Sequence, residues 1–192
     1  MKRLYEMGAL KRTVIIWTAF MALLWAVFGI AALVYPDAYQ LSEDAVPAGQ
    51  MNALSLFTYI VVMNALVGLL IAGGNLFVRF GVVTPGLLVL AYQGIQIGWL
   101  AGTNGFATPF SSVWAAHMAF LRVGLWETSA YALVCAVTLP KSLYIAATFP
   151  ARAWEEERTL HDVRLDKNEL AILAVAIIFW LGAAVSETLL LT

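Results

Sequence analysis

The chain has 192 residues, of which 62% are hydrophobic and only 12% are charged, with a formal net charge of −1 and a mean hydropathy of +0.83. Soluble domains carry roughly 25% charged residues, so this composition excludes an ordinary water-soluble fold and indicates an integral membrane protein. The near-neutral charge gives no reason to expect a nucleic-acid partner. One cysteine and two histidines are too few for a structural zinc site, and we expect no metal and no cofactor.

Apolar stretches predict an all-α bundle of about five membrane-spanning helices in a single domain covering residues 1–192, because crossing ~30 Å of hydrocarbon takes about 20 residues. The first stretch starts at Thr13 and is longer than the ~7–15 residues of a signal-peptide core, so we expect it to be a true span. The predicted spans cover residues 13–35, 52–78, 80–101, 113–139 and 169–191.

Basic residues orient the predicted bundle. All but one of them fall on the same side of a five-span arrangement, whereas the first loop on the other side carries only acidic groups. Cytoplasmic loops are enriched in Lys and Arg, so the N-terminus is predicted to be cytoplasmic and the C-terminus outside. The residues on the cytoplasmic side are Lys2, Arg3, Lys11, Arg12, Arg79, Lys141, Arg152, Arg158, Arg164 and Lys167.

The predicted loops differ in length. Residues 36–50 form an external loop, and residues 102–112 form a short one with turn signals at Asn104-Gly105 and Pro109. Residues 140–168 form a cytoplasmic segment. Within it we expect an interfacial or half-inserted helix over 142–149 and a mixed-charge helix over 151–168. The second helix is either solvated or docked to a cytoplasmic partner.

Glu127 lies near the centre of the fourth predicted span, where an ionisable group costs at least ~2.5 kcal/mol. We therefore expect Glu127 to be a hydrogen-bonded structural acid, part of a proton or ion pathway, or a polar lock between subunits. Arg122 lies five residues away, or about 140° around a regular helix, and does not share its face. Depth in the membrane favours an ion pair between Arg122 and Glu187, at the outer end of the fifth span.

Small residues repeat at four-residue spacing in the predicted spans, which is typical of closely packed membrane helices. Gln93 and Gln96 share the glycine-rich third span and are expected either to hydrogen-bond between helices or to line a polar cavity. The packing positions are Gly94, Gly98 and Gly102 on the third span and Gly124 and Thr128 on the fourth.

No motif predicts catalysis. Ser111 and Ser112 lie near His117 but lack a nucleophile-elbow pattern, and no phosphate-binding glycine loop is present. His117 alone is weak evidence for a haem or pigment ligand. We therefore expect a protein that is not an enzyme.

Three short motifs occur along the chain: 64–68 with the following Gly94 and Gly98, 122–127 with Ala130, and 183–187. Together they resemble the stage II sporulation protein M family of bacterial and archaeal integral membrane proteins. Gly124, Glu127 and Glu187 match the family pattern, whereas Arg122-Val123 stands where the family has Pro-His. The resemblance covers most of the chain from Asn64 onward.

The resemblance implies a scaffold or permease-like component of the bacterial or archaeal cytoplasmic membrane. The leading hypothesis is a non-enzymatic subunit of a larger membrane complex, with the lipid bilayer and other membrane proteins as partners. The alternatives are a permease-like subunit with a Glu/Gln pathway, and an accessory subunit of a respiratory or photosynthetic complex.

Overall fold

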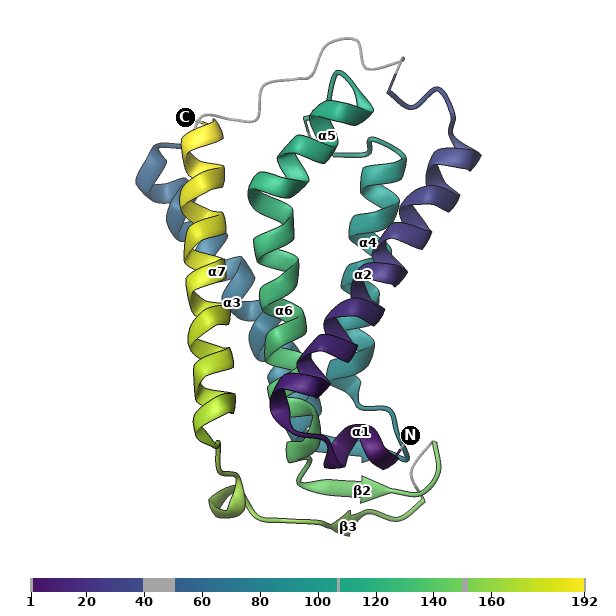
Figure 1. Ribbon diagram of the computed structural model, residues 1–192, viewed down its shortest axis with the longest axis vertical. Helices are drawn as coiled ribbons and strands as arrows, with labels where there is room; N and C mark the ends of the chain where they lie inside the picture. Colours follow the sequence, from purple (N-terminus) through teal and green to yellow (C-terminus); the bar gives the residue numbers. More distant parts are fainter. Residues whose placement is uncertain (1, 40–50, 107, 150–151, 192) are drawn as a thin grey trace.

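The computed structural model describes residues 2–39, 51–106, 108–149 and 152–191, and it is mostly helical (Figure 1). The beginning of the chain and the end of α7 lie at opposite ends of one helical bundle. Two of the acidic residues in the predicted external loop over 36–50, Glu43 and Asp44, lie outside the described residues. The α-helices are α1 (Lys2–Glu6), α2 (Ala9–Val34), α3 (Ala53–Phe77), α4 (Pro85–Gly102), α5 (Val113–Ala119), α6 (Leu125–Thr138) and α7 (Lys167–Leu191).

Four helical segments of the described chain are long and apolar enough to cross a membrane: Ala9–Val34, Ala53–Phe77, Val113–Lys141 and Lys167–Leu190. This finding confirms the prediction of a helical protein with several membrane spans. The third predicted span, residues 80–101, corresponds to α4, which is shorter at 18 residues, or ~27 Å at 1.5 Å per residue. It begins after the predicted position because Thr84 caps it, accepting a hydrogen bond from the Leu87 N–H, and Pro85 occupies its first turn.

Helix α4 packs along α2 through its glycines. A Cβ atom at Gly98 would lie 2.4 Å from the Leu24 carbonyl oxygen, and one at Gly102 would lie 2.5 Å from the Ala31 Cβ atom. These distances are shorter than any real contact, so only glycine permits this approach of the two backbones. The small-residue face of α4 is therefore occupied within the chain itself.

Helix α6 is the centre of the bundle. Every residue from Thr128 to Leu139 is buried, and α6 contacts α2, α3 and α7. Its N-terminal side continues from α5 through a π-helical segment, Phe120–Gly124. The predicted regular helix over 113–139 is thus interrupted in its N-terminal half.

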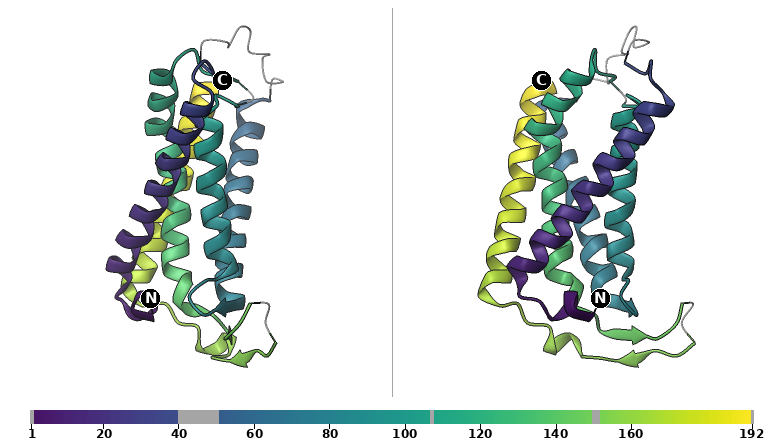
Figure 2. Two further views of the ribbon diagram at one scale, coloured as in Figure 1. Left: turned by 90° about the vertical axis from the view of Figure 1, so that its right-hand side faces the viewer. Right: turned by 45° about the vertical axis from the view of Figure 1, so that its right-hand side comes forward.

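A small sheet covers the end of the bundle that carries most of the basic residues (Figure 2). Strands β1 (Val78–Phe80) and β2 (Tyr144–Ala146) pair in parallel, and β3 (Glu155–Glu156) pairs antiparallel with β2. The predicted helices over 142–149 and 151–168 are therefore wrong within the described residues, which contain there the two strands and one 3₁₀ turn, Leu160–Asp162. Strand β1 is distant in sequence from β2, and pairing with it satisfies the backbone hydrogen-bonding groups of β2. No local sequence pattern indicates this pairing.

Candidate functional site

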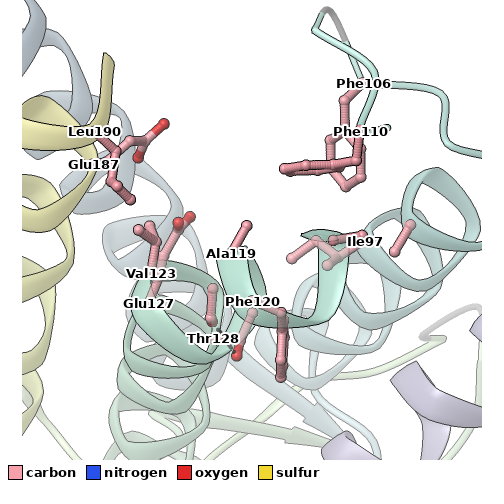
Figure 3. Close-up of a pocket in the computed structure, with 13 residues that line it drawn as sticks. Ile97, Phe106, Phe110, Ala119, Phe120, Val123, Glu127, Thr128, Glu187 and Leu190 are labelled. Atoms are coloured by element: carbon pink, nitrogen blue, oxygen red, sulfur yellow. Dashed lines mark hydrogen bonds between the residues drawn. The ribbon is translucent and has the colours of Figure 1, made fainter. Parts of the chain in front are cut away.

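A cavity of about 310 Å³ opens between α4, α7 and the continuous helix formed by α5, the π segment and α6 (Figure 3). Its lining includes Glu187 and Leu190 from the end of α7, which lies at the end of the bundle opposite to the sheet. Its size falls in the lower range of small-molecule sites. The lining residues are Ile97, Ala101, Phe106, Phe110, Ala116, Ala119, Phe120, Val123, Gly124, Glu127, Thr128, Glu187 and Leu190.

Two acidic side chains line this otherwise apolar cavity. Glu127 comes from α6 and Glu187 from α7, and Figure 3 shows both side chains at the same side of the space. None of the lining residues is basic. The ion pairs among the described residues involve Glu157 and Glu169 instead, outside the cavity. Two carboxyl groups in such surroundings require protons or a cation for charge balance.

Glu127 is held by a hydrogen-bonded chain of three side chains. The Tyr131 hydroxyl lies 2.8 Å from Glu127 Oε1 and 2.9 Å from Asn64 Oδ1. One hydroxyl proton serves only one of these acceptors. Asn64 Nδ2 is buried and has no partner among the described residues. In the flipped orientation of the Asn64 amide, Oδ1 and Nδ2 exchange positions. Nδ2 then donates to the Tyr131 hydroxyl oxygen, and the tyrosine hydroxyl donates its proton to Glu127.

The wall of the cavity contains the π-helical segment. The Leu125 N–H donates to the Phe120 carbonyl oxygen, five residues back, where a regular helix would use four. The Thr128 hydroxyl donates to the Gly124 carbonyl oxygen at 2.6 Å. Such segments are frequent at functional sites. Here the irregular turn supplies Phe120, Val123 and Gly124 to the lining, immediately before the turn that carries Glu127.

Aromatic rings from the connection between α4 and α5 form another wall. Phe106 and Phe110 pack edge to face, with ring centroids 5.3 Å apart. Asn104 fixes this connection: its side chain accepts from the Phe110 N–H at 2.8 Å and donates to the Phe110 carbonyl oxygen at 2.9 Å. Asn104 also has a positive φ of 52°, which Asn tolerates better than most residues. The predicted turn at Asn104-Gly105 therefore positions a phenylalanine against the cavity.

The structure brings together only part of the predicted polar network. Glu127 and Glu187 share the cavity, whereas Arg122, Gln93 and Gln96 are not among its lining residues. Arg122 is exposed, and it forms no ion pair within the described parts of the chain. The expected Arg122–Glu187 pair is therefore wrong. Depth in the membrane does not fix the direction of a side chain, and the π segment changes that direction by altering the rotation per residue.

Other predicted residues lie outside the cavity. His117 Nδ1 donates a hydrogen bond to the Val113 carbonyl oxygen at 2.7 Å, and its ring stacks on Trp25, with ring centroids 5.3 Å apart. Among the described residues, no three His, Cys, Asp or Glu side chains are placed to hold a metal ion.

Sequence reasoning missed most of the apolar lining and the role of Tyr131. Tyr131 lies four residues after Glu127 and so shares its helix face, which is a signal that the sequence contains. The phenylalanines of the loop carry no such signal, because their position depends on how Asn104 folds the connection.

Comparison with protein-family models, curated proteins and solved structures finds no match for this chain. The helices and their composition define it as a multi-span integral membrane protein.

Proposed function

We propose that the protein crosses the cytoplasmic membrane of a bacterium or archaeon five times, with its N-terminus in the cytoplasm. Helix α4 is then the third of the five spans, and the other four are the longer apolar helices. The basic end of the bundle, with Arg79 and Lys141 beside the sheet, faces the cytoplasm. The acidic cavity then lies toward the outer surface of the membrane.

Within this topology, the cavity is a binding site for a small organic cation, and the protein acts as a permease-like component. The observation that supports this function is the convergence of Glu127 and Glu187 from two helices on one apolar cavity without a basic lining residue. Carboxylates in a poorly hydrated site attract a positive charge strongly. The rings of Phe106, Phe110 and Phe120 offer apolar contact and faces that favour cations.

A matched pair of probes tests the binding site. Benzyltrimethylammonium and neopentylbenzene have nearly the same shape, but only the first carries a charge. We expect the protein in lipid nanodiscs to bind the cation at least tenfold more tightly than the neutral probe, measured by ligand-observed NMR. Equal binding of the two probes would contradict the proposal.

Variants locate the binding. Glu127→Gln with Glu187→Gln removes both charges while keeping the side-chain shapes, and should weaken cation binding about tenfold or more. Glu156→Gln removes the same charge from an exposed position on β3 and should leave binding unchanged.

Uptake of the radiolabelled cation into proteoliposomes then tests transport. We expect Glu127→Gln to abolish uptake while the protein still assembles in the membrane.

A second candidate function is a subunit or scaffold of a larger membrane complex. The outer face of α4 favours it, because this face exposes the polar Gln96 within a helix that we place in the membrane. The resemblance to the stage II sporulation protein M family, carried by Gly124, Glu127 and Glu187, adds to this candidate. Purification in mild detergent tests it: stable co-purifying membrane proteins support it, and an isolated active protein counts against it.

A further inference from the structure

The face of α4 that points away from α2 is largely uncovered among the described residues, although the Trp99 ring packs edge to face on Tyr35 at the C-terminal end of α2. Tyr92 is 60% exposed, Leu88 57%, Ile95 46% and Trp99 41%, and Gln96 is also exposed. These positions follow the spacing of one helix face. The glycines that allow close packing, Gly94 and Gly98, lie on the opposite side.

Gln96 occupies a central depth of the bundle. Its neighbours Gly94 and Gly98 meet Phe20 and Leu24, which lie near the middle of the spanning helix α2. The Gln96 side chain has no hydrogen bond within the part of the chain that the structure describes. An amide exposes two N–H donors and one carbonyl oxygen, and hydrocarbon offers none of the partners that water would supply.

We propose that a second copy of this chain covers this face, with the two Gln96 side chains hydrogen-bonded to each other across a two-fold axis. A primary amide is both donor and acceptor, so it is complementary to itself, and a two-fold axis places the same residue opposite itself. Polar side chains of this kind join membrane helices where the hydrophobic effect provides no driving force. Tyr92 and Trp99 lie one turn to either side of Gln96 and extend the contact along the helix.

This inference rests on the proposed five-span topology, which places α4 in the membrane, and is independent of cation binding in the cavity. Cysteine cross-linking in native membranes separates the two. In a Cys135→Ala background, Gln96→Cys should form disulfide-linked dimers under oxidation. Leu69→Cys and Ile178→Cys, which replace exposed residues of α3 and α7, should remain monomeric.

The labelling of Gln96→Cys distinguishes the ways in which the inference can fail. Reaction with a membrane-impermeant maleimide would show that this position faces water, and would overturn both the topology and the inference. Absence of both labelling and cross-linking would leave the topology standing and overturn the dimer. Cross-linking to a different protein instead of a second copy would also overturn it.

The strength of self-association tests the role of the amide. We expect Gln96→Leu to weaken dimerisation about 5- to 20-fold in nanodiscs or detergent, measured by single-molecule or analytical ultracentrifugation methods. Gln96→Asn keeps the amide and should retain more of the association than Gln96→Leu. Leu69→Ala serves as a control for altered helix surfaces. An unchanged dimer in Gln96→Leu, or a monomeric wild type at high membrane density, would contradict the inference.

Discussion

Arg12 and Glu169 are 157 positions apart in the sequence and form a buried ion pair, with 3.1 Å between Arg12 Nη2 and Glu169 Oε1. Lys141 binds the other carboxylate oxygen of Glu169 at 2.8 Å. The Arg12 guanidinium also donates to the carbonyl oxygens of Ala136 and Met7. One acidic side chain therefore joins the starts of α2 and α7 to the end of α6.

Loss of Glu169 should destabilise the protein strongly. Glu169→Gln leaves two cations near each other without their carboxylate, and removing one partner of a buried pair typically costs about 3–5 kcal/mol. We expect a clearly lowered midpoint of thermal unfolding in detergent. Glu157→Gln is the matched control, because Glu157 is half-exposed and lies 3.9 Å from Arg158, a kind of pair that contributes about 0–1 kcal/mol. Equal effects of the two variants would show that the buried cluster does not stabilise the fold.

Two glycines of the α3–α4 hairpin should respond in opposite ways to substitution by alanine. A Cβ atom at Gly86 would lie 2.1 Å from the Ile71 carbonyl oxygen and 2.4 Å from Asn75 Oδ1, so the two helices must separate in Gly86→Ala. At Gly73 nothing lies within 4 Å. Gly73→Ala should be neutral or stabilising by about 0.5–1 kcal/mol, as for a helix interior, and Gly86→Ala should destabilise by more than that amount. Similar unfolding midpoints for the two variants would contradict the close approach of α3 and α4.

Tyr5 should make stability depend on pH in the alkaline range. Burial raises the pKa of Tyr5 from 10.0 to about 12, although the nearby Arg79 opposes this rise. Its hydroxyl donates to the Val82 carbonyl oxygen at 2.9 Å, and its ring lies 4.4 Å from the Arg79 guanidinium carbon. The folded protein holds the Tyr5 proton more tightly than the unfolded chain. This stabilisation is complete below pH ~10 and is lost as the pH rises through about 12.

The measurement compares the wild type with Tyr5→Phe across that range. The difference in unfolding midpoint between the two proteins should be constant up to pH ~10 and then shrink toward pH 12. A difference that stays constant to pH 12 would show that Tyr5 does not titrate differently in the folded and unfolded states.

The sequence predicted most of the helices because membrane spans depend on local composition. A long apolar stretch such as 53–77 has few alternatives to a helix in hydrocarbon, where each backbone group must be bonded within the segment. Residues 142–149 are also apolar but do not form a helix, because Tyr144–Ala146 within them pairs with Val78–Phe80. Parallel strand pairing joins distant segments and leaves no short-range pattern.

The candidate site shows the same division between features that depend on local sequence and features that depend on contacts between distant segments. Intramembrane acids are rare, so Glu127 and Glu187 stand out in the sequence. Depth in the membrane predicted a partner only for Glu187, namely Arg122, and no partner for Glu127. The π segment and the packing of α7 instead bring Glu187 to the cavity of Glu127 and leave Arg122 exposed.

The sequence by itself determined that this protein belongs in a membrane, and it located the long apolar helices and the costly acids within them. These properties depend on the free energy of transferring each segment from water to lipid, which is a sum over neighbouring residues. Only the tertiary structure decided that Glu127 and Glu187 share one cavity, that Glu169 joins three helices, and that Gln96 faces outward. Those relationships depend on the rotation and packing of whole helices, which no single segment of the sequence specifies.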